Sequence, residues 1–129
     1  MSQDRPTIDN ILRTVRDFLD TLMPKLEGEP RYHTQVSSYL LGICEREVLL
    51  RERSDAEEHA EMTRFLGHDG ALPDLTQELC ERIRSGAYDN RWDEVMDLVL
   101  TQTIRKLRIV RPDHLDPMHR EGDAASAEA

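Results

Sequence analysis

The chain lacks the features that mark several large classes of protein. It has 17 Lys and Arg against 26 Asp and Glu, a net charge of −9, so it has no basic excess with which to neutralise nucleic-acid phosphates. No apolar run approaches the ~20 residues that a membrane-spanning helix needs. The first residues also lack the basic, apolar and small-residue order of a secretory signal. We therefore expect a cytoplasmic protein with no nucleic-acid partner and no membrane partner.

Cysteine is scarce, and metal-ligand motifs are missing. Cys44 and Cys80 are the only two cysteines and have no CxxC spacing, so we expect both to be reduced, buried, small apolar residues. Asp55 and His59 are four residues apart, but neither HExxH nor paired ExxH motifs occur, which argues against a zinc or dinuclear site. The loop 67–70 is too short for a phosphate-binding loop and has no lysine. The sequence therefore predicts no metal and no cofactor.

The apolar residues that are present recur at helical spacing, and no segment shows the alternation of a strand. In residues 8–22 they follow one narrow arc, whereas in residues 90–110 they cover about half of the circumference, as in a central helix with several neighbours. Prolines and glycines separate the segments. The sequence therefore predicts an all-α fold, a single-domain bundle of about five helices. The expected helices are residues 8–22, 31–53, 55–66, 73–86 and 90–110.

Two local signals set further boundaries. Ser54 and Glu57 form a capping-box pattern, so we expect one helix to end and the next to begin there. The short helix after this point should dock weakly and be the most mobile element, because its inner face is poor in apolar area. We expect residues 1–112 to form the helical domain and residues 113–129 to form a flexible, acidic and Ala-rich tail. The predicted inner face of the weak helix consists of Ala56, His59, Ala60, Thr63 and Leu66.

A carboxylate stands in the apolar arc of the second predicted helix. Glu47 shares this arc with Val36, Leu40 and Ile43, and a lone buried carboxylate costs several kcal/mol. Arg51 follows four residues later and can pair with Glu47 at the edge of the helix while the stem of the side chain packs inside. The other interpretation is a carboxylate that serves an interface or a pocket. The sequence leaves both interpretations open.

Histidine and a cluster of cations offer two further candidates. His33 has a side chain suited to general-base catalysis, but it lies 14 residues before Glu47, about 20 Å along a helix, so the two cannot share a proton. A capping or core-edge histidine is the alternative interpretation. Residues 105–111 carry four basic side chains and no acidic one, which suits the last turn of a helix. The alternative is a docking patch for a phosphorylated ligand or for an acidic partner surface. The candidate phosphate-binding residues are Lys106, Arg108 and Arg111.

Several stretches together resemble a small bacterial helical family of formerly unknown function, over most of residues 5–115. Its members resemble the companion protein of aminoglycoside-phosphotransferase-like kinases, encoded beside such a kinase and an acyl-CoA dehydrogenase, as in levulinate and other 4-hydroxy-acid catabolism. The kinase phosphorylates the hydroxyl of a hydroxyacyl-CoA. The shared features are Arg5-Pro6, Val15 to Leu19, the Pro24…Leu26…Gly28 break, Arg31-Tyr32-His33 with Val36, Ile43 with Arg46-Glu47, Ile83 to Gly86, and Lys106-Leu107…Pro112.

This resemblance implies a non-catalytic partner subunit that binds and supports the kinase. It also implies that basic residues near the end of the last helix meet the phosphates of the acyl-CoA held by the partner. Two other interpretations stay open: an independent small-molecule enzyme with His33 as general base, and a structural homodimer formed through the second helix. The residues expected in or beside the partner interface are Arg31, His33, Arg46 and Glu47.

Overall fold

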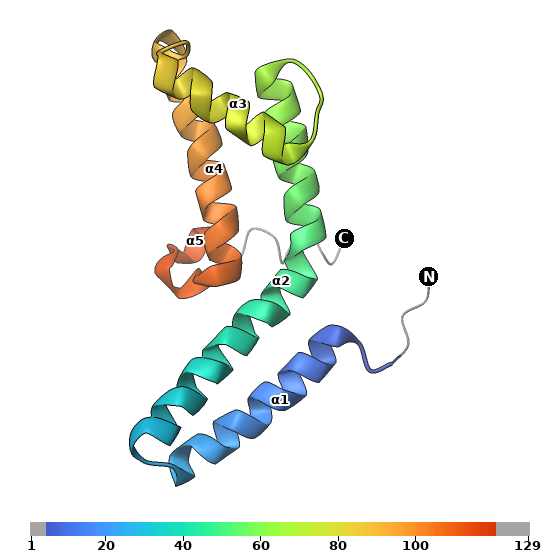
Figure 1. Ribbon diagram of the computed structural model, residues 1–129, viewed down its shortest axis with the longest axis vertical. Coiled ribbons are helices and arrows are strands. Elements are labelled where there is room, and N and C mark those ends of the chain that lie inside the picture. The colour runs from blue at the N-terminus through green and yellow to red at the C-terminus, as the bar shows by residue number, and fades with distance from the viewer. Residues whose placement is uncertain (1–4, 121–129) are drawn as a thin grey trace. The chain divides into compact units, whose positions relative to one another are not determined.

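The structure, a computed structural model, describes residues 5–120. Over this range it contains five α-helices, three short 3-10 helices and no strand, which confirms the predicted all-α class (Figure 1). Within the same residues, no helix is both long enough and apolar enough to cross a bilayer. The α-helices are α1 (Ile8–Leu22), α2 (Gly28–Leu66), α3 (Leu72–Ser85), α4 (Trp92–Val110) and α5 (Pro117–Arg120); the 3-10 helices are Met23–Lys25, Asp89–Arg91 and Pro112–His114.

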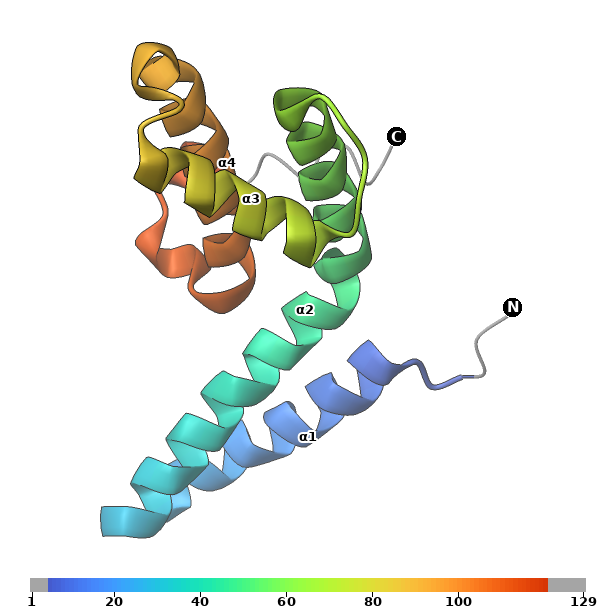
Figure 2. The same cartoon turned by 45° about the horizontal axis from the view of Figure 1, so that its top comes forward.

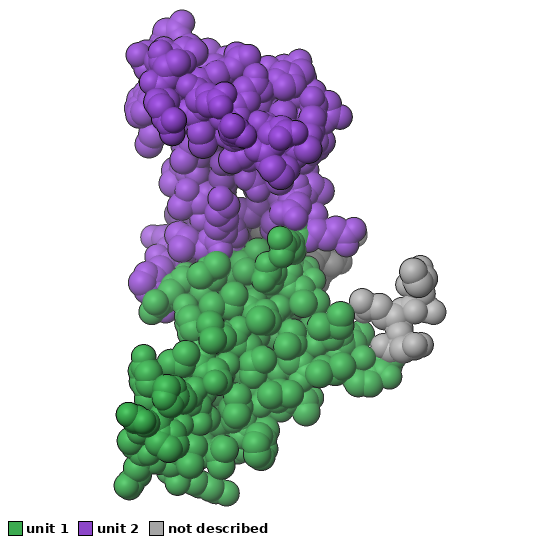
Figure 3. Space-filling model, viewed as in Figure 1, with its two compact units in different colours: residues 1–51, 109–111 green, residues 52–108, 112–129 purple. Residues whose placement is uncertain are grey.

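The chain divides into two compact units, which Figure 3 colours separately. The first unit consists of residues 1–51 and 109–111, and the second consists of residues 52–108 and 112–129. The first unit therefore contains α1 and the first part of α2, whereas the second contains the rest of α2, α3, α5 and most of α4. Each unit has its own packing.

One continuous helix replaces two predicted ones. α2 passes through Ser54 without interruption (Figure 1), so the predicted helix boundary at this serine is wrong. The residues on both sides are helix formers with no intervening glycine or proline. The ion pair Arg53–Glu57 at 3.0 Å spans Ser54, and the pair Glu47–Arg51 at 2.7 Å lies just before it; each joins residues one helical turn apart and supports the helix. A serine followed three residues later by glutamate caps a helix only where the backbone is already turning.

The apolar core of the second unit lies where α2, α3 and α4 pack together. Met62 of α2 is fully buried in it, and the rings of Phe65 and Tyr88 meet edge to face with centroids 5.0 Å apart. The predicted inner face of residues 55–66 is wrong in part: Leu66 packs against the core as expected, but Ala56 and Ala60 are exposed and Met62 was omitted. Which side of this segment is buried is set by the positions of α3 and α4. The buried core residues are Met62, Leu75, Leu79, Tyr88 and Val95.

The segment after α4 begins with ordered turns, so the predicted tail (113–129) starts too early. Leu115 is buried, and Arg120 Nε donates a hydrogen bond to its carbonyl oxygen at 2.8 Å. Arg108 Nε donates to a backbone carbonyl of α5 at 2.6 Å. A single apolar residue and arginines that bind the backbone give no periodic pattern, which is why the sequence did not reveal these turns. The remainder of the predicted tail, residues 121–129, lies outside the described residues.

Candidate functional site

In the first unit, α1 lies beside the first part of α2 and contacts it through polar side chains (Figure 2). Glu45 of α2 is only 5 % exposed, and two arginines of α1 surround its carboxylate. Arg13 Nε lies 3.2 Å from Oε1, and Arg16 Nε lies 2.9 Å from Oε2. About two turns away along α2, Ser38 Oγ donates a hydrogen bond to the Asp20 carboxylate at 2.5 Å. The contact between the two helices therefore contains a buried carboxylate that is paired with two partly exposed arginines.

The buried carboxylate of α2 is thus Glu45, a residue that sequence analysis missed. Glu47 lies on the surface of the helix. The Glu47 side chain is 43 % exposed and pairs with Arg51 at 2.7 Å. The predicted ion pair of Glu47 with Arg51 is therefore present, but it lies on the surface, and the interface interpretation of Glu47 stays a prediction. The error arose because α1 packs against the side of α2 that carries Ser38 and Glu45, which are seven residues apart and therefore share a face.

The apolar arcs of the first unit are exposed. No residue of α1 is buried, although its apolar side chains form a regular stripe. Among the described residues of this unit, no large apolar side chain is buried. A stripe of this kind normally faces a core, so this unit presents two apolar helix faces that residues 5–120 leave exposed. The stripe residues are Ile8, Ile11, Val15 and Phe18 in α1, exposed by 45–62 %, and Val36 and Leu40 in α2, exposed by 36 % and 52 %.

The structure distributes the predicted interface residues along α2. Arg31 and His33 are exposed near its start, and the rings of Tyr32 and His33 are 5.7 Å apart. In the described part of the chain, no carboxylate, hydroxyl or thiol is hydrogen-bonded to His33, so the geometry gives it no base-activating group. Arg46 Nε donates to the carbonyl oxygen of Ile109 at 2.7 Å. His33 and Glu47 thus lie at the two ends of the exposed apolar arc.

Arg46 and Tyr39 hold residues 109–111 against α2 within the first unit. The hydroxyl of Tyr39 donates to the carbonyl oxygen of Val110 at 3.1 Å. The guanidinium of Arg111 lies 5.5 Å from the centroid of the Tyr39 ring, a cation–π distance. Together with Tyr32, Gln35 and Val36, these two side chains line an open, mostly apolar hollow of about 330 Å³.

The other two predicted phosphate ligands have different environments. Lys106 is exposed on α4. Arg108 uses its Nε to bind the backbone of α5, which is a structural role. Arg111 is therefore the member of this predicted set that lines a hollow.

Both cysteines are exposed and free, so the expectation that they are buried is wrong. Cys44 extends the exposed apolar arc of α2, and Cys80 lies next to buried Leu79 on α3 but faces outward. Over the range that the structure describes, no group of three His, Cys, Asp or Glu side chains converges as a metal site would require. His59 contacts Asp69 at 2.8 Å instead of Asp55.

Two histidines fasten the loop between α2 and α3. Beside the His59 contact, His68 Nε2 lies 2.5 Å from Glu78, and its Nδ1 lies 3.1 Å from the carbonyl oxygen of Asp69. The hydrogen bond to Asp69 and the contact with Glu78 raise the pKa of His68 above its ordinary value. Burial raises the pKa of Glu78, but hydrogen bonds from His68 and Arg82 outweigh burial and lower it overall. The loop is therefore held best when His68 is protonated and Glu78 is ionised.

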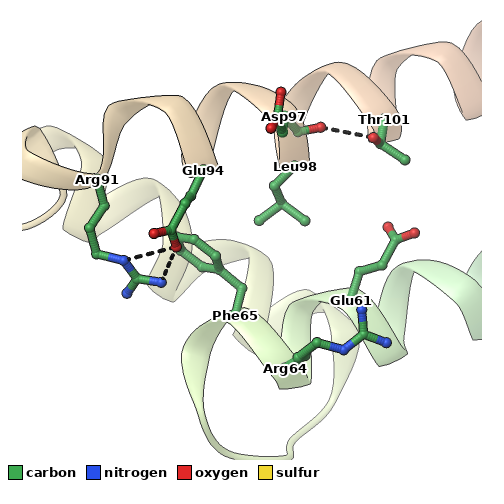
Figure 4. A pocket seen from close by; sticks show the side chains of 8 residues that line it. All are labelled: Glu61, Arg64, Phe65, Arg91, Glu94, Asp97, Leu98 and Thr101. Carbon is green, nitrogen blue, oxygen red and sulfur yellow. Dashed lines mark hydrogen bonds and ion pairs between the residues drawn. The ribbon is translucent and has the colours of Figure 1, made fainter.

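The second unit has a groove of about 360 Å³ between α2 and α4 (Figure 4). Phe65 and Leu98 provide its apolar lining, and the guanidinium of Arg91 lies 4.6 Å from the centroid of the Phe65 ring. Arg91 also binds Glu94 through two nitrogens, at 2.6 and 3.1 Å (Figure 4). These charged groups neutralise one another, and the lining contains no nucleophile paired with a base. The groove thus contains three carboxylates, of Glu61, Glu94 and Asp97, and two of them are paired with arginines, Glu61 with Arg105 and Glu94 with Arg91.

Comparison with known proteins assigns a family. A family model described as "Domain of unknown function (DUF6285)" matches residues 24–114. The match covers more than half of the 129-residue chain, so the chain belongs to this family. No curated protein matches the chain. No solved structure matches it either.

Proposed function

We propose that this member of the DUF6285 family is a non-catalytic partner subunit that binds and supports an aminoglycoside-phosphotransferase-like kinase acting on hydroxyacyl-CoA. One observation carries the proposal: in the first unit, both helices expose their apolar faces, and no large apolar side chain there is buried. Burial of one such side chain contributes about 1.5–3 kcal/mol, so covering this surface strongly favours assembly. The choice of a kinase as the partner rests on the sequence resemblance to companion proteins of aminoglycoside-phosphotransferase-like kinases.

The composition of this surface supports a protein interface. Apolar residues of α1 and α2 form its centre, while His33 and Glu47 mark the two ends of the α2 arc. An apolar centre with a polar rim is the usual anatomy of an interface. Arg31, exposed near the start of α2, adds a charge at the rim. Arg46 has a positioning role, because its hydrogen bond to Ile109 holds residues 109–111 in place.

The hollow beside Arg111 gives the partner's substrate a contact. Its guanidinium supplies charge for a phosphate, and the neighbouring rings of Tyr39 and Tyr32 supply apolar faces. We assign this hollow to a phosphate or adenine group of the CoA that the kinase holds. Lys106 is exposed and remains a second candidate for such a contact.

We place this assembly in the cytoplasm. Both cysteines of the chain are free and exposed. Exposed thiols persist in a reducing compartment, whereas an oxidising one promotes disulfides. This observation agrees with the expectation drawn from the sequence.

The test is co-expression of the chain with an adjacent kinase, followed by size exclusion with mass measurement and an assay of hydroxyacyl-CoA phosphorylation. We expect a stable complex and a kinase that is inactive or insoluble alone. Val15→Asp with Phe18→Asp should abolish the complex, because two charges would enter the apolar centre. Glu47→Ala should weaken it. Glu81→Gln, an exposed change on α3, is the matched control and should leave it intact.

Two results would refute the proposal. One is full kinase activity without this chain and no complex on size exclusion. The other is an intact complex with the Val15 and Phe18 double variant, provided that circular dichroism shows normal helix content. No contact supports His33 as a general base: its ring meets that of Tyr32, and it has no acid partner among the described residues.

A further inference from the structure

Two arginines of the first unit meet over a buried glycine of α2. Gly42 is buried and stands in the interior of a helix, a position where glycine is less stable than alanine. Nη1 of Arg16, from α1, and Nη1 of Arg46, from α2, lie 3.6 and 3.4 Å from the point that a Cβ of residue 42 would occupy. Nη2 of Arg46 lies 3.9 Å from the same point. The glycine therefore lets guanidinium groups from two helices approach one stretch of backbone.

Each of these guanidinium groups is held by one of its sides. Arg16 pairs through Nε with Glu45 Oε2 at 2.9 Å, and its Nη2 lies 3.5 Å from Oε1 of the same carboxylate. Arg46 donates from Nε to the carbonyl oxygen of Ile109 at 2.7 Å. The three Nη atoms that flank Gly42 form no hydrogen bond with any residue from 5 to 120. They are positioned in advance and still have donors to offer, an arrangement that lowers the entropic cost of binding a ligand.

The charges of this cluster do not balance. Three arginines, Arg13, Arg16 and Arg46, lie around a single carboxylate, that of Glu45. The partner of Arg46 is a backbone carbonyl oxygen, which carries no full charge. The cluster therefore keeps an excess of two positive charges, although the net charge of the chain is −9. Two guanidinium groups that flank one point repel each other, and an anion between them replaces this repulsion with attraction.

We propose that Arg16 and Arg46 form a binding site for a phosphate group beside Gly42, carried by a small phosphorylated molecule or present as free phosphate. Two guanidinium groups from different helices can each donate to separate oxygens of one tetrahedral anion. The Arg16 side chain is 32 % exposed, so a ligand can reach the site from solvent. The inference goes beyond the proposed function, because it needs no kinase and uses none of the residues that line the hollow beside Arg111.

A phosphate group suits this site better than a carboxylate does. A phosphate monoester carries a charge of about −1.5 to −2 near neutral pH and has three strong acceptor oxygens. This matches the two uncompensated positive charges and the three Nη atoms that flank Gly42. A carboxylate brings one negative charge and two oxygens, so it would leave part of the charge and one of the donors without a partner.

Titration of the full chain with inorganic phosphate, followed by NMR at constant ionic strength and at about pH 8, where phosphate is mostly a dianion, tests the inference. We expect saturable shifts of the Gly42 amide and of the Arg46 Nε–H signal, with a dissociation constant of about 0.1–10 mM for a site that is partly open to water. Acetate should bind about tenfold more weakly or worse, because it carries half the charge.

Phenyl phosphate is the second probe, and it separates the two sources of the phosphate group. Binding at least as tight as that of inorganic phosphate supports an organic monoester as the ligand. Weaker binding of phenyl phosphate supports free phosphate as the ligand. Either result supports the site itself, provided that the same Gly42 and Arg46 signals shift.

Three variants test the named side chains. Arg46→Gln should weaken phosphate binding about tenfold or more, because it removes one charge and the forked donors. Arg51→Gln is the matched control: it makes the same change on the same helix, at an arginine that pairs with Glu47 on the exposed face, and it should alter the affinity by less than about twofold. Arg16→Lys keeps the charge but loses the forked guanidinium, so it should also weaken binding about tenfold with unchanged helix content.

Four results would overturn the inference. They are a Gly42 amide that shows no saturable shift, equal losses of affinity in Arg46→Gln and Arg51→Gln, unchanged affinity in Arg16→Lys, and acetate binding as tight as that of phosphate. The last result would point to a carboxylate as the occupant. Because none of these measurements includes the kinase, a failure here leaves the proposed function standing, and a failure of the kinase complex leaves this site standing.

Discussion

Arg105 of α4 and Glu61 of α2 form a bidentate ion pair at the edge of the second unit's core. Arg105 Nη2 lies 2.7 Å from Oε1 of Glu61, Nη1 lies 3.1 Å from Oε2, and Nε lies 3.4 Å from the carboxylate of Glu57. Arg105 is only 7 % exposed. Burial lowers the pKa of Arg105, but the hydrogen bonds and charge of Glu61, with Glu57 and Glu58, outweigh burial and raise it overall. The carboxylates are therefore what makes burial of this cation tolerable.

Removal of Glu61 should destabilise the second unit. Glu61→Ala leaves the Arg105 guanidinium buried with one longer ion pair, and we expect a loss of about 2–3 kcal/mol in the free energy of unfolding. Urea denaturation followed by circular dichroism measures it. Glu94→Ala is the matched control, because Glu94 pairs with Arg91 at the surface and is 60 % exposed; its cost should stay below about 0.5 kcal/mol. Equal losses in the two variants would contradict the structure.

Glu45 should hold α1 against α2, whereas Glu47 should not. Glu45→Ala removes the carboxylate that Arg13 and Arg16 share. We expect amide exchange in α1 to accelerate about tenfold, equivalent to about 1.4 kcal/mol of easier local opening. Glu47→Ala, two residues away on the exposed face, should leave exchange in α1 unchanged. Faster exchange in α1 caused by Glu47→Ala would show that the buried and exposed carboxylates are assigned wrongly.

The loop between α2 and α3 should loosen at high pH. The raised pKa of His68 means that its stabilising contribution is fully present below its ordinary pKa near 6.5 and is lost as pH rises through the higher folded value. The lowered pKa of Glu78 acts in reverse: its contribution is present above its ordinary value near 4.5 and is lost as pH falls through the lower folded value. The loop should therefore be held best between the ordinary pKa of Glu78, near 4.5, and the ordinary pKa of His68, near 6.5.

Hydrogen exchange of the loop amides at several pH values, corrected for intrinsic exchange rates, measures this dependence. His68→Gln should remove the loss of protection above neutral pH. His33→Gln, a change at an exposed histidine in the first unit, should leave the pH profile of the loop unaltered. A loop that remains equally protected through pH 9 in the wild type would contradict the role given to the contact between His68 and Glu78.

Ser54 should behave as the interior residue of a helix and not as a cap. Ser54→Ala should increase stability by up to about 0.5 kcal/mol, because alanine has the higher helix propensity. A capping serine would instead lose about 1 kcal/mol on the same change. Thermal unfolding of the two proteins decides the sign. A clear loss of stability would mean that α2 is interrupted at this position.

Sequence alone determined the class of the fold and most of its segments. The helical spacing of apolar residues in 8–22 and 90–110 predicted α1 and α4 nearly to their ends. The reason is that apolar residues on one side of a helix recur every three or four positions in the sequence. Pro73 and Gly86 bounded α3 for a similar reason: each acts on its own backbone, and Gly86 adopts φ +82°. These are local properties, and they do not depend on what the helix packs against.

Only the tertiary structure decided which face of each helix is buried. The sequence placed Glu47, Cys44 and Val36 on an inward arc, yet α1 packs against Ser38 and Glu45 and leaves that arc exposed. Periodicity shows that a helix has an apolar side, but it does not show whether the same chain supplies a partner for that side. Burial depends on the packing of distant segments, and within residues 5–120 parts of the apolar faces of α1, α2 and α4 stay exposed.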